Sequence, residues 1–220
     1  MELITTFIWI LIAGLIGLLI SGVFAGKFKL SRKKFLIPYV IISIAFVILV
    51  FFIESVNLYS ILIENWIWGI LAGGIVGIFL VKNVFSQPSS RNKSGKSLIV
   101  DMVWSGLAYG VTDSLLLNIF PVLIVWFGFS SIGWTTSLLG LILVSIIGLI
   151  SSLFVTTLYH IGYPEFRNKK LILVLFGNTL ITLAYIIPAN PLGAIISHTL
   201  MHLAAVYRGA ETTVQLPPHY

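Results

Sequence analysis

Apolar residues form long uninterrupted blocks along the chain, with short polar segments between them. A helix of about 20 residues crosses the roughly 30 Å hydrocarbon core of a bilayer at about 1.5 Å per residue. The pattern therefore predicts an all-α fold, a polytopic membrane helical bundle of about seven transmembrane helices, with a range of six to eight. The predicted spans are Leu3–Phe24, Phe35–Ile53, Ile61–Val81, Leu98–Phe127, Trp134–Leu158, Leu171–Ile187 and Pro191–Val206.

Two of these blocks depart from the simple pattern. Ile61–Val81 carries Glu64 near its outer end. Leu98–Phe127 is about 30 residues long, which exceeds what an upright helix needs to cross the hydrocarbon core. We therefore expect this block to be either steeply tilted or broken near Gly106 or Gly110.

The composition agrees with a membrane protein. Hydrophobic residues make up 58% of the 220 positions and charged residues 9%, and the mean hydropathy is +1.07. A water-soluble domain has about 45–50% apolar and about 25% charged residues, so a soluble fold is excluded. The chain has no Cys, which excludes disulfides, thiolate metal sites and a cysteine nucleophile.

The basic residues predict the orientation of the bundle. All 13 Lys and Arg residues lie in segments that seven spans would place on one side, namely Ala25–Lys34, Lys82–Ser97, Ile161–Lys170 and Arg208. The opposite connections contain none. The positive-inside bias then predicts a multi-pass protein of the cell membrane with its basic loops in the cytoplasm and its N-terminus outside. The net charge of +6 is explained by this topology and by contact with membrane lipid, and we expect no nucleic-acid partner.

The N-terminus predicts a retained first helix, because it has no basic region and no small-residue cleavage site in the right place. A polar linker then divides the chain. The predicted regions are 1–85, an N-terminal three-helix membrane region; 86–97, a cytoplasmic linker; 98–208, a C-terminal four-helix region; and 209–220, a cytoplasmic tail. The tail is polar and ends in prolines, and the pattern leaves open whether it is disordered or folds back under the bundle.

A few polar residues lie inside the apolar blocks. An ionised side chain at mid-bilayer costs roughly 2.5–3.5 kcal/mol, so Asp113, near the centre of its block, is either functional or a buried carboxyl bonded to a Thr or Tyr of a neighbouring helix. Asp101 reads more simply as a carboxylate near the cytoplasmic headgroups. Glu165 belongs to a solvated loop, and His219 belongs to the tail.

Three histidines lie within or at the end of apolar blocks. His198 and His202 are four residues apart and project from one helical face, a spacing that suits two ligands of one metal ion or two donors to one substrate. The alternative is hydrogen bonding across a helix interface to Asn178, Thr179 or Thr182. His160 ends its block, where it either takes part in the site or caps helix carbonyls.

From about Leu98 to Arg208, these residues resemble the CAAX prenyl protease and bacteriocin-processing (CPBP) family of intramembrane proteases. That family has Glu-Glu-x-x-x-Arg, Phe-x-x-x-His and His-x-x-x-Asn motifs on successive helices. The corresponding segments here are Thr112-Asp113-Ser-Leu-Leu-Leu117, Phe154-Val-Thr-Thr-Leu-Tyr-His160 and His198-Thr-Leu-Met-His202. The departures are Thr112 and Asp113 for the two Glu, Leu117 for the Arg, two extra residues before His160, and His202 for the Asn.

The resemblance implies an intramembrane endopeptidase that hydrolyses a peptide bond of a membrane-bound peptide or protein substrate in a cytoplasm-facing cavity. Asp113 would accept a proton from the attacking water, and His160 would orient that water. His198 and His202 would donate to the developing oxyanion.

Three other interpretations remain open at the level of sequence. Asp113, His160, His198 and His202 form a ligand set for zinc or another divalent ion. A degenerate relative would bind a membrane partner as a scaffold or immunity-type protein without cleaving it. A transporter would use the buried Asp and His to relay protons, although no internal repeat supports it. A shared site requires the four side chains to converge within about 8 Å around a hydrated pocket.

Overall fold

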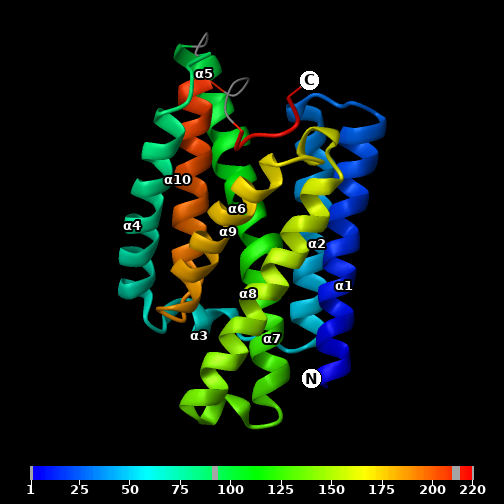
Figure 1. Cartoon of the computed structure of the whole chain (residues 1–220), viewed down its shortest axis with the longest axis vertical. Helices are drawn as coiled ribbons and strands as arrows, with labels where there is room; N and C mark the ends of the chain where they lie inside the picture. The colour runs from blue at the N-terminus through cyan, green and yellow to red at the C-terminus, as the bar shows by residue number, and fades with distance from the viewer. Residues whose placement is uncertain (1, 91–93, 210–213, 220) are drawn as a thin grey trace.

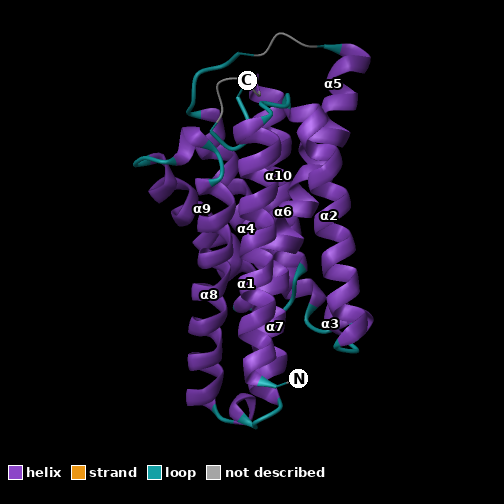
Figure 2. Ribbon diagram, turned by 90° about the vertical axis from the view of Figure 1, so that its right-hand side faces the viewer, coloured by secondary structure: helices purple, strands orange, loops and turns teal. Residues whose placement is uncertain are grey.

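The computed structural model describes residues 2–90, 94–209 and 214–219, and within these ranges it contains helices and no strands. The chain runs up and down the long axis of one bundle (Figures 1 and 2). The helices are α1 (Leu3–Ile20), α2 (Arg32–Ile53), α3 (Leu58–Ile63), α4 (Trp66–Phe85), α5 (Gly95–Asp101), α6 (Tyr109–Asp113), α7 (Phe120–Ser130), α8 (Leu138–Ile161), α9 (Lys170–Ile186) and α10 (Leu192–Gly209).

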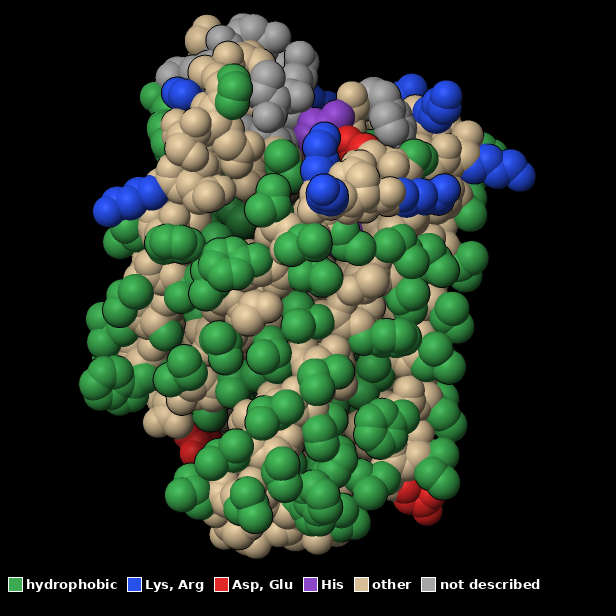
Figure 3. Space-filling view, in the orientation of Figure 1, with side chains coloured by type: hydrophobic (Ala, Val, Ile, Leu, Met, Phe, Trp, Pro, Cys, Tyr) green, Lys and Arg blue, Asp and Glu red, His purple; other side chains and the backbone are tan. Residues whose placement is uncertain are grey.

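Five helical stretches of the described chain are long and apolar enough to cross a membrane: Leu3–Lys27, Arg32–Ile53, Trp66–Phe85, Gly95–Ser130 and Leu138–Ile161. Helix α9 is a shorter apolar helix. Large apolar side chains cover the flanks of the bundle in Figure 3, an arrangement that lipid stabilises and water does not. The chain is therefore a membrane-embedded helical bundle.

The long fourth block forms one helical run from Gly95 to Ser130, so the alternative of a break near Gly106 or Gly110 is wrong. Two π-helical segments, Met102–Ala108 and Ser114–Ile119, interrupt the regular winding without ending the helix. The two glycines instead allow close packing on α10. A Cβ atom on Gly110 would lie 2.8 Å from the Cα of Thr199, so only glycine permits this approach.

The third block is not a single span from Ile61 to Val81 as predicted. Its first part belongs to α3, and α4 starts only at Trp66, after Asn65 takes the left-handed conformation with φ 56°. Asn190 stabilises this corner, because its side-chain amide donates to the carbonyls of Ile61 at 3.1 Å, Leu62 at 3.0 Å and Glu64 at 2.6 Å.

Helices from the two sides of the polar linker pack against each other. Helix α4 lies along α10, and α1 lies along α8. On α4 the contact is a stripe of buried glycines four residues apart, Gly69, Gly73 and Gly77. A Cβ on Gly73 would lie 2.9 Å from the carbonyl oxygen of Gly193, so the stripe brings the α4 backbone close to α10.

The Lys and Arg side chains seen in Figure 3 gather at the end of the bundle where the C-terminus lies. This end carries the connection after α1, the connection between α8 and α9, and the end of α10. The polar residues described next are reached from it.

Candidate metal centre

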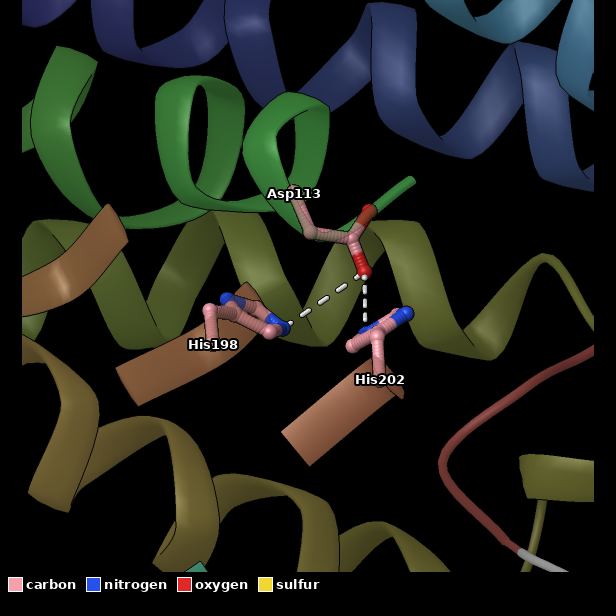
Figure 4. Close-up of side chains that lie close together, drawn as sticks. All are labelled: Asp113, His198 and His202. Carbon is pink, nitrogen blue, oxygen red and sulfur yellow. Dashed lines mark ion pairs between the residues drawn. The ribbon is translucent and has the colours of Figure 1, made fainter. Parts of the chain in front are cut away.

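Asp113, His198 and His202 meet inside the bundle (Figure 4). Asp113 is the last residue of α6, and the two histidines lie one turn apart on α10. The Oδ2 atom of Asp113 is 3.6 Å from Nε2 of His198 and 3.4 Å from Nε2 of His202. All three side chains are buried, and one ligand atom from each lies within 4.8 Å of the others.

The backbone brings these side chains together through Gly110. Gly110 and Asp113 are three residues apart and share a face of the helical run. The close contact of Gly110 with Thr199, which lies between the two histidines in sequence, sets α6 directly on α10. Asp113 is thereby carried to the two imidazole rings.

Tyr39 of α2 fixes the other oxygen of the carboxyl group. Its hydroxyl donates a hydrogen bond of 2.5 Å to Oδ1 of Asp113. The Tyr39 ring is buried and stacks on the Tyr159 ring with centroids 5.0 Å apart. Oδ1 is therefore occupied, and Oδ2 is the atom that faces the histidines.

A buried chain of polar groups sets the proton positions on His198, beginning at Ser152. The Ser152 hydroxyl lies 2.6 Å from the carbonyl oxygen of Leu117, which can only accept, so the hydroxyl donates there. Asn178 must then donate its Nδ2 to Ser152 Oγ, at 3.0 Å. Its Oδ1 consequently accepts from Nδ2 of Asn118, at 2.8 Å.

Asn118 completes the chain, because its Oδ1 is left to face Nδ1 of His198 at 3.1 Å. Thr182 supports the same assignment: its hydroxyl donates to the Asn178 carbonyl at 2.8 Å and so accepts from Asn118 Nδ2 at 2.9 Å. In neutral His198 the proton is therefore on Nδ1, and Nε2 presents a lone pair to Asp113. One sequence interpretation expected His198 to bond directly to Asn178 or Thr182. Instead, Asn118 lies between them and makes the hydrogen bonds to both sides.

The two separations between Asp113 and the histidines are close to those around a shared cation, and the three ligand atoms all lie within 4.8 Å of one another. A lone pair on nitrogen facing a carboxylate oxygen needs a positive charge between them, either a proton or a metal ion. Direct N–H···O hydrogen bonds are about 2.7–3.2 Å long, shorter than both distances here. Two ligands bound at about 2.0–2.1 Å around a tetrahedral ion lie about 3.3 Å apart, close to the observed 3.4 and 3.6 Å. The buried cluster could hold a metal ion.

The cluster lines a cavity of about 420 Å³. One wall consists of apolar side chains of α4 and α9, and the C-terminal segment contributes to the cavity at the basic end of the bundle. The wall residues on α4 and α9 include Phe79, Leu80, Leu173, Val174, Phe176 and Ile181. The cavity leaves room for a water molecule or a substrate group beside the three ligand atoms.

His160 lines the same cavity but is not part of the three-residue cluster. Its Nδ1 lies 2.9 Å from the carbonyl oxygen of Thr156 and donates to it. This is the bond to a helix carbonyl that we expected as one alternative for a histidine in the last turn of α8. The structure therefore brings together three of the four predicted side chains and leaves His160 in the wall with Nε2 as its remaining acceptor.

The other acidic and basic candidates lie outside the cavity lining. Asp101 is buried and pairs with Lys33, with 2.5 Å between the charged atoms. Glu165 is half-buried, and its Oε2 lies 2.6 Å from Nδ1 of His219. These contacts belong to the basic end of the bundle and do not involve Asp113.

Two of the altered motif positions, Thr112 and Leu117, supply no acid or base. The Thr112 hydroxyl donates to the Ala108 carbonyl of its own helix at 2.8 Å, and Leu117 places a buried apolar side chain against the cavity. The chain matches no protein-family model, no curated protein and no solved structure. The chemistry of the site accordingly rests on Asp113, His198, His202 and the residues that orient them.

Proposed function

We propose that the protein is a membrane-embedded endopeptidase that cleaves a peptide bond of a membrane-associated substrate, as in CPBP proteases, but with Asp113, His198 and His202 as ligands of a divalent metal ion in place of the metal-free roles that the resemblance implies. The observation that carries this proposal is the convergence of one carboxylate oxygen and two imidazole nitrogens on a cavity, at separations that suit a shared ion. Three protein ligands with an open position are typical of catalytic zinc, so zinc is the ion that we propose.

A divalent ion bound here supplies Lewis-acid activation of a water molecule. The chain's own residues supply orientation and a dry setting. Tyr39 holds the Asp113 carboxyl group, and Asn118 holds the His198 ring with Nε2 toward the ligand position. His160, in the cavity wall with Nε2 available, is the residue that we propose orients the attacking water.

We further propose that α9 and α10 also span the membrane, which gives seven spans with the N-terminus outside the cell membrane. The placement of basic side chains at one end of the bundle supports this orientation. The cavity would then be reached from the cytoplasmic side, where water and a peptide segment are available.

The test measures metal content and hydrolysis separately. The purified protein is stripped with a chelator and titrated with zinc, and its hydrolysis of a library of membrane-associated peptides is followed by mass spectrometry. We expect one zinc ion per chain, and we expect Asp113→Asn, His198→Gln and His202→Gln to reduce both binding and hydrolysis by about 100-fold or more. Asp101→Asn is the matched control, because Asp101 lies outside the cavity lining.

Two results would contradict the proposal in different ways. Failure of the stripped protein to bind zinc or another divalent ion would remove the metal site. Zinc binding without hydrolysis of any library member would leave a metal-binding or scaffold protein and no enzyme.

A further inference from the structure

The C-terminal segment lies over the cavity that contains the candidate metal centre. Its described part, Val214–His219, crosses the basic end of the bundle (Figure 1). Val214, Gln215 and Pro217 line the cavity together with the three candidate ligands. Leu216, Pro217 and Pro218 are buried, so the segment packs into the bundle and does not simply lie on its surface.

Side chains of the bundle bind main-chain groups of this segment, in addition to the contact of the His219 side chain with Glu165 at 2.6 Å. Arg32 donates from Nε to the carbonyl of Leu216 at 2.6 Å and from Nη2 to the carbonyl of Pro218 at 3.1 Å. Tyr109 donates its hydroxyl to the carbonyl between them, that of Pro217, at 3.2 Å. These three contacts satisfy three consecutive carbonyl groups of a non-helical segment.

Gln87, at the start of the linker, holds the other end of the segment. Its Oε1 accepts from the backbone N–H of Val214 at 3.1 Å. Its Nε2 donates to the side-chain oxygen of Gln215 at 3.0 Å. Of the five hydrogen bonds from Arg32, Tyr109 and Gln87, this one alone involves a side chain of the segment. Four main-chain groups within five residues are thus bound by side chains of the bundle.

Tyr109 belongs to a buried group of phenols that keeps its hydroxyl in position. The Tyr159 hydroxyl lies 2.9 Å from that of Tyr109 and 2.6 Å from that of Tyr163. Burial raises the pKa of Tyr163 well above its usual value, because a phenolate would lose its hydration, so this loop residue remains a neutral donor. Tyr109 and Arg32 are thereby the donors that point at peptide carbonyls, and Gln87 is the acceptor for a peptide N–H.

We propose that Gln87, Arg32 and Tyr109 form a groove that binds the main chain of a peptide, and that residues 214–218 occupy this groove as an intramolecular competitor. The groove opens on the cavity, so a peptide bound there would lead toward Asp113. Main-chain contacts do not depend on sequence, and a substrate segment can therefore replace the tail. Assigning the peptide as the substrate rests on the proposed function, whereas peptide binding itself does not.

The covalent attachment of the tail makes it a strong competitor. A short covalent tether gives the attached segment an effective concentration of about millimolar. An added peptide at micromolar concentration therefore displaces the tail poorly from the full chain. Removal of the tail exposes the groove and its three side chains.

The experiment uses a fluorescent peptide of sequence TVQLPPHY, which corresponds to residues 213–220, and the protein in detergent. Fluorescence anisotropy compares the full chain with a chain that ends at Gly209. We expect the shortened chain to bind the peptide about tenfold or more tightly than the full chain. We expect Arg32→Ala in the shortened chain to weaken binding by about tenfold. Lys34→Ala is the matched control, because Lys34 is an exposed cation two residues away.

A second design covers a shortened chain that fails to fold. A protease recognition sequence inserted between Gly209 and Val214 allows the tail to be released after the full chain has been purified. A peptide that carries His219→Gln lacks the side-chain contact with Glu165 and keeps the four main-chain contacts, so we expect it to bind within a few-fold of the native peptide. All binding measurements are repeated in the Asp113→Asn background, where loss of hydrolysis leaves the groove intact.

Equal binding by full and shortened chains, or unchanged binding after Arg32→Ala, would overturn the groove. Loss of binding by the His219→Gln peptide would overturn its main-chain character. Peptide binding without any hydrolysis by the wild-type site would retain the groove and reject the proposed hydrolase.

Discussion

The Tyr39 hydroxyl and the Asp113 carboxyl group form a buried hydrogen bond of 2.5 Å between residues 74 positions apart in the sequence. It joins α2, in the N-terminal half, to the acidic residue of the candidate metal centre. Because Tyr39 occupies one carboxyl oxygen, the geometry of the other oxygen toward His198 and His202 is fixed before any ligand binds.

The variant Tyr39→Phe tests this positioning. It keeps the buried ring stacked on Tyr159 and removes only the donor. We expect a loss of about 10–100-fold in zinc affinity and a destabilisation of about 1–3 kcal/mol, because a buried carboxyl oxygen loses its partner. Zinc titration and chemical unfolding measure the two effects. Tyr59→Phe, at an exposed tyrosine, should change neither, and an unchanged affinity in Tyr39→Phe would show that the bond does not position Asp113.

The proton assignment on His198 is tested at Asn118. Asn118→Leu removes the acceptor for Nδ1 of His198 and also the donor to Asn178, so both zinc affinity and stability should fall. Asn118→Asp keeps an acceptor for Nδ1, so we expect it to retain zinc affinity although it loses the amide donor. The two variants are compared by competition with a zinc-binding dye. Equal losses in both would contradict the assigned tautomer.

The close packing of α6 on α10 is tested by Gly110→Ala. The new methyl group would lie 2.8 Å from the Cα of Thr199, so the helices must separate and carry Asp113 away from the histidines. We expect a cost of about 1–3 kcal/mol in stability and a weaker zinc site. Gly74→Ala is the control, because a Cβ atom at this position would have no neighbouring atom within 4 Å. Alanine is also a better helix former than glycine, so this variant should not be destabilised. Similar losses in both variants would show that the close contact at Gly110 does not position Asp113.

The proposed orientation is tested with single cysteines, which the natural chain lacks. Ile132→Cys lies at the end of the bundle opposite the basic loops, and Lys169→Cys lies in a basic loop. With a membrane-impermeant maleimide on intact cells, we expect labelling of Ile132→Cys alone. Lys169→Cys should react only after the membrane is opened. The reverse result would invert the topology and place the cavity on the outer side.

The sequence predicted the membrane-embedded helical class because hydropathy depends only on local composition. It missed the corner between α3 and α4, because Asn65 adopts a left-handed conformation inside a block of uniform hydropathy. It also treated the glycines of the fourth block as weak points. Their role depends on Thr199 and Leu203 of a distant helix, which no local pattern reveals.

At the site, the sequence singled out Asp113, His198 and His202 because each is costly in an apolar block. It did not single out Tyr39 or Asn118, which hold them in place, and it named Asn178 as a direct partner of the histidines, whereas Asn178 acts through Asn118. Tyr and Asn are common in such segments, and their partners lie on other helices. The sequence did contain a clue to Asn118. It is a polar residue only five positions after Asp113 in the same apolar block.

The cavity takes its walls from both sides of the polar linker. Phe79 and Leu80 come from the first half, together with Tyr39, which holds Asp113 from behind the wall, whereas Asp113 and His198 come from the second half. The first three long helices are therefore more than a membrane anchor for a self-sufficient enzyme domain. If the chain were cut at the linker, each fragment would carry only part of the cavity wall. Only reassociation of the two fragments would restore a complete cavity and, with it, activity.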